Sequence, residues 1–335
     1  MPDIPLLLVL IVLVALVFDF TNGAHDSANA IATVVSTKVL SPRTAVLMAA
    51  SLNLIGAMLG DQVATTLGKG VVNPDMLSGS QLLVLAALLG AIGWNLITWY
   101  VGIPSSSSHA LIGGLIGATV VHAGFSALNG ASILEKIILP LFMSPLAGFF
   151  AGFLLMELIT ILCWHFNRRK TNNFFHHIQV CSSAFMAISH GLNDAQKTMG
   201  IITLALYLFG EIEVIHVPFW VKILCASAMA TGSAIGGWKI VKTMGHKIFK
   251  LEPVHGFAAE TSASLVISAA SMFGAPISTT HTITACIFGV GSTKRLSAVR
   301  WNVAGQLVTA WLLTIPAAAI MGGVAFGLLH LVGLG

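Results

Sequence analysis

GIPSSSSH, at residues 102–109, is the stretch that decides the fold of this chain, because it recurs as GAPISTTH at residues 274–281. The two copies lie 172 residues apart. Two further pairs of segments recur at nearly the same spacing: GAHDSAN at 23–29 with GLNDAQK at 191–197, and SPLAG around Pro145 with TIPAA around Pro316. Three landmarks that recur in one order at one spacing indicate an internal duplication. The sequence therefore predicts two related halves.

The composition places the chain in a membrane. Of its 335 residues, 56% are hydrophobic and only 8% are charged, whereas soluble domains carry about 25% charged residues. Residues 76–134 and 301–335 contain no Asp, Glu, Lys or Arg, and each run exceeds the roughly 20 apolar residues of a transmembrane helix. We expect helices throughout, because lipid offers no partners to unpaired backbone groups. We expect no cofactor and no metal site, since the four cysteines lack paired spacing.

Clusters of Lys and Arg predict the orientation of the chain, because basic residues favour the cytoplasmic side. They lie near Lys38, Arg168, Lys242 and Arg295. If every cluster is cytoplasmic, ten apolar stretches alternate across the membrane and both termini lie outside. This asymmetry accounts for the net charge of +4, and no nucleic-acid partner is expected.

Each half then has about five crossings, an odd number, so the second half must be inverted relative to the first. We predict an all-α integral protein of the cell membrane, with broken helices and re-entrant segments. The predicted divisions are a first transmembrane repeat at 1–162, a basic cytoplasmic loop at 163–175 and a second, inverted repeat at 176–335.

The motif that begins at Asp19 interrupts an apolar stretch with Gly, Asn and Asp, and its second copy does the same. Gly23 precedes Asp26 by three residues, and Gly191 precedes Asp194 by three. Glycine there permits a helix break, and Asp, Asn and Gln supply oxygens that suit an alkali cation or accept a proton. An ionised Asp near the bilayer centre costs about 2.5–3.5 kcal/mol and so faces a cavity or a partner. The alternative is a position at helix ends near the interface.

The GIPSSSSH motif predicts a hydroxyl-rich helix start in each half. Its hydroxyl-bearing residues are Ser106, Ser107 and Ser108 in the first copy and Ser278, Thr279 and Thr280 in the second. Helix capping needs only one hydroxyl, and capping alone is the alternative interpretation. Free amides at a helix N-terminus, with several hydroxyl donors, suit a tetrahedral oxyanion. Two such starts that face each other would hold phosphate from both sides.

Each of four residues near these motifs has more than one interpretation. His109 and His281 close the two copies and either orient the site or pack. Lys197 pairs with the anion or with Asp194, or extends toward the cytoplasmic face. Glu260 begins an apolar stretch and faces either the cavity or the interface.

Together these segments resemble the inorganic phosphate transporter (PiT) family over essentially the whole chain. The resemblance is carried by GAHDSANA at 23–30, its GLNDAQK echo, the two GxPxSxxH segments, and GFAAETSAS around Glu260. It implies an inverted-repeat transporter, often a homodimer in the lipid bilayer, that couples phosphate entry to sodium or protons.

The resemblance also implies roles for individual residues. The positions that match the family's signature for cation and phosphate are Asp26, Asn29, Asn193, Asp194 and Gln196; the two hydroxyl-rich starts match its re-entrant phosphate-binding segments; and Glu260 matches an acidic position in many relatives. Many relatives have Asn where this chain has His25. An imidazole titrates near neutral pH and is a poor sodium ligand, so the coupling ion stays open at this position.

Charge arithmetic favours coupled transport. Phosphate brings about one to two negative charges near neutral pH, and Asp26 and Asp194 would repel it strongly in a low-dielectric site. Cations or protons must therefore bind with it. We predict a cation-coupled phosphate symporter that works by alternating access, without enzymatic activity. The alternatives are a permease for sulfate or another oxyanion, a phosphate channel, and an intramembrane enzyme for a phosphorylated lipid, which would need its reactive cluster in only one copy.

Overall fold

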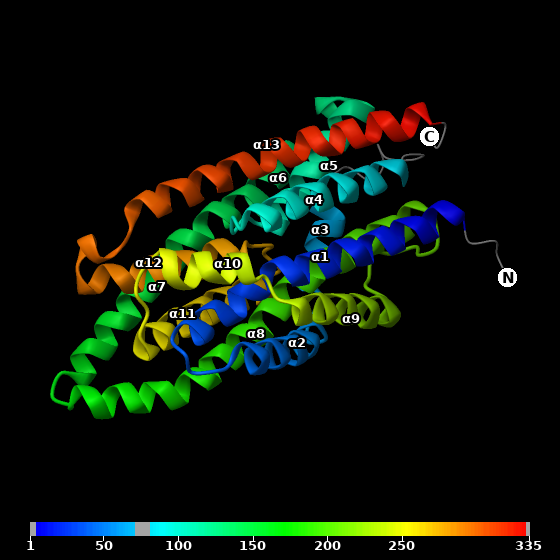
Figure 1. Cartoon of the computed structure of the whole chain (residues 1–335). Coiled ribbons are helices and arrows are strands. Elements are labelled where there is room, and N and C mark those ends of the chain that lie inside the picture. Colours follow the sequence, from blue (N-terminus) through cyan, green and yellow to red (C-terminus); the bar gives the residue numbers. More distant parts are fainter. Residues whose placement is uncertain (1–4, 71–80, 333–335) are drawn as a thin grey trace.

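The computed structural model describes residues 5–332 except 71–80, and its regular elements are helices (Figure 1). The α-helices are α1 (Leu6–Ser36), α2 (Pro42–Ala57), α3 (Gln62–Gly70), α4 (Gln81–Val101), α5 (Ser107–Ala123), α6 (Gly130–Ile133), α7 (Leu139–Cys163), α8 (Arg168–Leu208), α9 (Phe219–Ile235), α10 (Trp238–Lys242), α11 (Pro253–Met272), α12 (Thr279–Lys294) and α13 (Trp301–Leu331). Shorter elements are η2 (Phe125–Ala127), η3 (Leu134–Ile138), η4 (Thr243–Lys247) and η5 (Leu296–Ala298). The all-α prediction is confirmed.

Four described helices are long and apolar enough to cross a membrane: α1, α4, α7 and α13. Helix α9 and the segment Trp238–Lys247 form a fifth candidate, bent by 60° at their junction. The start of α1 and the end of α13 lie at the same end of the bundle (Figure 1). The terminal residues themselves, which we predict to be outside, fall beyond the described ranges.

Helices of the two halves correspond in order and pack in matched pairs. Helix α5 packs against α13, and its counterpart α12 packs against α7. In the same way α1 packs against α9, and its counterpart α8 packs against α2. In Figure 1, α13 lies along α4 and α5. The duplication inferred from the motifs therefore appears as reciprocal packing between the halves. The limits 1–162, 163–175 and 176–335 stay a prediction.

The predicted helix breaks at Gly23 and Gly191 are wrong. Helix α1 runs without interruption through Gly23, and α8 through Gly191. Each glycine instead allows a close helix contact: a Cβ on Gly23 would overlap the carbonyl oxygen of Met229, and one on Gly191 that of Asn53. Small residues let helix backbones approach closely in membranes. The bend lies instead between α9 and α10, at Gly236, whose φ is 77°.

This packing makes a prediction for stability. We expect Gly23→Ala and Gly191→Ala to lower the free energy of unfolding by about 1–3 kcal/mol, as overpacking does in tight interiors. Gly327→Ala on α13 is the matched control, because a Cβ there meets no atom within 4 Å, and we expect no loss of stability. Thermal unfolding of the detergent-purified protein measures both. Equal midpoints for all three variants would contradict the packing role.

Two hairpins carry the hydroxyl-rich starts into the interior. Helix α4 leads to α5 through a turn at Gly102, and α11 leads to α12 through a turn at Gly274; their φ values of 79° and 68° suit glycine. At 17 and 16 residues, α5 and α12 are about 24–26 Å long, less than the roughly 30 Å hydrocarbon core. Their starts are buried, as expected of re-entrant segments.

The apolar core falls into two clusters that α1 connects. Leu8, Ile11, Ala15 and Phe18 belong to one cluster, and residues 28–34 contribute to the other. The polar motif of α1 lies between these two parts. The candidate site is therefore flanked along α1 by packed apolar layers.

Candidate functional site

The motif segments meet in the interior although they are far apart in sequence. The first residues of α5 and α12, Ser107 and Thr279, are buried together with Asp26 and Asp194. At the third residue of each helix, the rings of His109 and His281 lie 4.6 Å apart between centroids. The starts of the two re-entrant helices therefore face one site.

Asp26 connects both helix starts. Its Oδ2 accepts a hydrogen bond from Ser107 Oγ of α5 (3.2 Å), and its Oδ1 accepts one from Thr280 Oγ1 of α12 (3.2 Å). His25 Nδ1 lies 2.6 Å from the same Oδ1. Its other nitrogen, Nε2, lies 3.2 Å from Thr98 Oγ1 of α4. This single carboxylate therefore holds hydroxyls from both halves of the chain.

Asp194 occupies the equivalent place on α8 with different partners. Thr279 Oγ1 donates to its Oδ2 (2.7 Å), and His190 Nε2 lies 3.1 Å from the same oxygen. Lys197 forms an ion pair with Oδ1 and also donates to the carbonyl of Ile277 (2.8 Å). Of the interpretations of Lys197 left open above, the structure selects the pair with Asp194.

The six predicted hydroxyls divide into two groups. Ser106 and Ser278 are N-caps that accept hydrogen bonds from the amides of His109 and His281 (3.2 Å each). Ser107, Thr279 and Thr280 donate to carboxylates, as described above, and Ser108 lies 3.4 Å from the Ile277 carbonyl oxygen. Capping alone therefore explains two of the six.

Asn29 joins the central group, because its Nδ2 donates to Thr280 Oγ1 (3.0 Å) and Thr279 Oγ1 (3.3 Å). Gln196 and Asn193 make other contacts. Gln196 Oε1 accepts from the amide of Val63 (2.8 Å) at the start of α3, and Asn193 Nδ2 donates to Ser271 Oγ of α11 (2.8 Å). Their described contacts are therefore with neighbouring helices.

Glu260 lies in a polar group of its own. Its carboxylate accepts hydrogen bonds from Thr33 of α1, from Ser182 of α8 and from Gln179 Nε2 of α8 (3.2 Å). It is fully buried, so it faces the interior and not the interface. Thr33 lies one helical turn beyond Asn29 on α1, which places Glu260 beside the central group without direct contact to the hydroxyl-rich starts.

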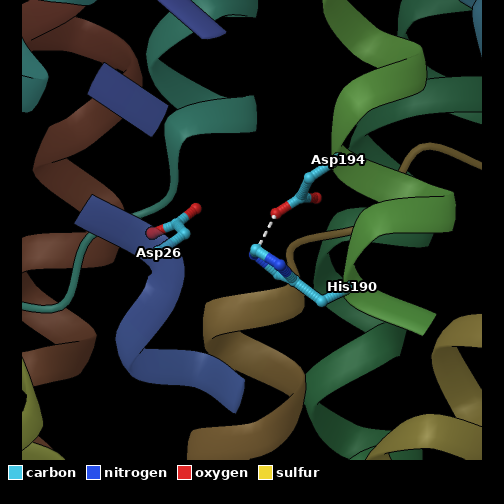
Figure 2. Close-up of side chains that lie close together, drawn as sticks. All are labelled: Asp26, His190 and Asp194. Carbon is cyan, nitrogen blue, oxygen red and sulfur yellow. Dashed lines mark ion pairs between the residues drawn. The ribbon is translucent and has the colours of Figure 1, made fainter. Parts of the chain in front are cut away.

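Figure 2 shows Asp26, His190 and Asp194 converging from α1 and α8. One ligand atom from each lies within 4.8 Å of the others, so these three groups could hold one cation. His190 was not among the predicted site residues, and no metal site was expected. A signal existed, because residues four apart share a helix face and His190 precedes Asp194 by four.

Comparisons with known proteins identify the family of the chain. A sequence model of the phosphate transporter family matches residues 22–169 and again residues 163–322. The chain is 46% identical over 332 residues to a probable low-affinity inorganic phosphate transporter of Bacillus subtilis (strain 168), covering 98% of this chain and 99% of that protein. A protein of the same description from Rhizobium meliloti (strain 1021) is 48% identical over 325 residues, with 96% of each covered.

A solved structure described as the sodium-dependent phosphate transporter is similar to the whole chain. Its TM-score is 0.90 at 25% sequence identity, and the similarity covers 97% of this chain and 99% of that one. Sequence and structure thus point to one family, and the chain belongs to the phosphate transporter family.

Proposed function

We propose that the chain is a cation-coupled symporter that holds inorganic phosphate between the starts of α5 and α12. By its family, the chain is a phosphate transporter with several membrane-spanning helices and not an enzyme. The observation that carries the finer proposal is the position of Asp26, whose carboxylate binds Ser107 and Thr280 together. The carboxylate of Asp26, the hydroxyl donors and the N-termini of α5 and α12 thus lie together in one site.

Competition for hydroxyl donors supplies a mechanism of coupling. Ser107, Thr279 and Thr280 donate to Asp26 and Asp194, and phosphate oxygens would accept from the same hydroxyls and from free helix amides. A proton or cation on the carboxylates weakens their hold on these donors. The hydroxyls can then turn toward phosphate, so cation and anion bind together.

The charges of the site require such a cation. Asp26 and Asp194 bring two negative charges, and Lys197 neutralises one of them. Phosphate would add at least one more in an interior where Coulomb interactions are strong. His25 and His190 could carry a proton, and Asp26, His190 and Asp194 could hold a metal cation.

We assign substrate binding to the two hydroxyl-rich starts and Asn29, and coupling to Asp26, Asp194, His25, His190 and Glu260. Asn193 and Gln196 support this group through α11 and α3. The halves at 1–162 and 176–335 would move against each other during alternating access. In this proposal the protein lies in the cell membrane as a homodimer, with both termini outside.

Uptake of labelled phosphate into proteoliposomes tests the proposal. We expect an inward gradient of sodium or of protons to stimulate uptake, and excess sulfate to leave it unchanged. Uptake that ignores both gradients would indicate a channel, and block of uptake by sulfate would indicate a general oxyanion permease. The similar structure is described as sodium-dependent, which favours sodium, whereas the imidazole of His25 favours a proton. Each gradient is therefore imposed separately.

The hydroxyls make a separate prediction. We expect Thr280→Val and Ser107→Ala to raise KM for phosphate roughly tenfold or more, since a hydrogen bond to a charged group contributes about 1.5–3 kcal/mol. Thr282→Val is the matched control, because the Thr282 hydroxyl donates to the Ser278 carbonyl within its own helix (2.8 Å). Equal KM values for Thr280→Val and Thr282→Val would show that the Thr280 hydroxyl does not bind phosphate.

A further inference from the structure

Asp19 of α1 is a fully buried acid that makes no hydrogen bond of ordinary geometry to any other described residue. Both of its carboxylate oxygens are unpaired among the described residues. Asp26, Asp194 and Glu260 differ, because each has three polar groups on its carboxylate. A buried ionised carboxylate that lacks partners is penalised by several kcal/mol. Asp19 must therefore take up a positive charge when it is enclosed as it is here.

The neighbours of Asp19 are short of partners too. Asn22 of α1, Thr198 of α8 and Cys225 of α9 lie beside its carboxylate. Asn22 Oδ1 and Thr198 Oγ1 have no hydrogen-bond partner within the described part of the chain. The group thus lies where three helices meet, and it contains four unpaired oxygens.

A proton on Asp19 would supply a donor that this group of oxygens lacks. A proton on one Asp19 oxygen creates a donor for Asn22 Oδ1, and the Thr198 hydroxyl can then donate to the other oxygen. Sodium is the poorer fit, because four oxygens are fewer than the six or more that hard cations take in proteins, and the next neighbour is the thiol of Cys225. The inventory of donors and acceptors therefore favours a proton.

The charges around Asp19 also favour its neutral form. Asp194 of α8 acts on it as a second negative charge, and Cys225 is the other titratable neighbour. The charged groups on the other helices that pack on α1 are exposed or have partners of their own. The exposed ones are Arg43 of α2, Lys242 of α10, His246 and Lys247 of η4, and Lys294 of α12. Of the others, Lys222 of α9 pairs with Asp61, Lys239 of α10 donates to the Tyr100 carbonyl, Glu260 of α11 binds Thr33, and His281 of α12 stacks on Trp311. Helix α4 carries no charged side chain. Lys197 and His190 of α8 both lie on Asp194, and His25 of α1 lies on Asp26. No described cation therefore forms an ion pair with Asp19.

The position of Asp19 places it in register with the central site. Asp19, Asp26 and Thr33 follow one another at intervals of seven residues, about 10 Å along α1 and close to one face. Thr33 binds Glu260, so three buried acids line up along α1 with Asp26 in the middle. Neither outer acid is duplicated: the equivalent positions hold Ala187 and Leu88. Each side of the central site has one acid of its own.

We propose that Asp19 is a proton-binding site of the transport cycle, two helical turns from Asp26 toward the start of α1. This assignment rests on the proposed symport. Asp19 binds a proton while α1, α8 and α9 enclose it, and releases it in the conformation that hydrates it. Phosphate movement is thereby linked to proton movement on this side of the central site.

Transport by Asp19→Asn tests the proposal, because asparagine keeps the shape of the side chain and cannot titrate. We expect wild-type proteoliposomes to take up phosphate faster under an inward proton gradient, and Asp19→Asn to retain uptake but lose this stimulation. Cys225→Ala is the matched control in the same pocket and should keep the stimulation. Uptake by Asp19→Asn with an unchanged proton response overturns the proposal, and so does loss of a sodium response alone.

An infrared titration of the protein in lipid is independent of transport. We expect a carbonyl band of a buried protonated carboxyl group in the wild type, absent in Asp19→Asn and present in Glu260→Gln. Identical spectra for wild type and Asp19→Asn overturn the proton site even if transport is lost. A wild type that takes up no phosphate overturns the proposed symport and the place of Asp19 in its cycle, while the spectrum still decides whether Asp19 binds a proton.

Discussion

Replacing Asp26 with Asn is expected to abolish phosphate uptake while the helix bundle stays folded. The carboxylate accepts from Ser107 and Thr280 and lies against His25. An amide has the same shape but presents two N–H groups and no negative charge. The amide nitrogen would then point its N–H groups at the hydroxyl of Ser107 or of Thr280, which donates to this position in the wild type. No negative charge would remain to attract a coupling cation.

The expected loss is large because the group is buried. Removing one partner of a buried, hydrogen-bonded charge costs about 2–5 kcal/mol, which is roughly thirtyfold or more in affinity for the coupling ion. Uptake at a fixed sodium or proton gradient should therefore fall to the level of empty liposomes.

Asp61→Asn is the matched control for this experiment. Asp61 is partly exposed and pairs with Lys222 at 2.8 Å, away from the hydroxyl-rich starts. Phosphate uptake by Asp61→Asn should therefore stay at the wild-type level. Size-exclusion chromatography in detergent checks that both variants are folded. Substantial uptake by Asp26→Asn would show that the Asp26 carboxylate is not needed for coupling.

Replacing Lys197 with Met is expected to destabilise the protein severely. Lys197 and Asp194 form a buried ion pair, and Lys197 also donates to Ile277. Breaking a buried pair by removing one partner costs about 3–5 kcal/mol, because the other charge stays buried without compensation. The thermal midpoint of the purified protein should drop accordingly.

A double-mutant cycle isolates this pair. Adding Asp194→Asn to Lys197→Met removes the uncompensated charge, so we expect the double variant to regain much of the lost stability. Lys222→Met is the matched control, because its partly exposed pair with Asp61 should contribute no more than about 1 kcal/mol. Equal losses for Lys197→Met and Lys222→Met would show that burial does not strengthen the Lys197 pair.

The glycines show where prediction from sequence failed. Gly23 and Gly191 were predicted to break helices because glycine lacks a Cβ and tolerates unusual backbone angles. The same lack of a Cβ also permits close packing, and the structure uses it so, against Met229 and Asn53. Which of these two properties matters depends on whether another backbone lies opposite, and that backbone is more than 130 residues away in sequence.

The acids show the same limit. The repeated spacing identified Asp26 and Asp194, since each follows a glycine by three residues in both copies. Asp19 and Glu260 occur in one half only, so duplication could not single them out. Among the described residues Asp19 has no hydrogen-bond partner and Glu260 has three donors. This contrast depends on side chains from other helices.

The sequence by itself determined the membrane class, the duplication and the four motif segments, because composition and spacing are local properties of the chain. Only the tertiary structure decided that the starts of α5 and α12 share Asp26, that Lys197 pairs with Asp194, and that Asp19 is enclosed with no hydrogen-bond partner in the described part of the chain. The physical reason is that these contacts join residues of different helices, often from different halves. Their geometry follows from how the helices pack, which no single stretch of sequence contains.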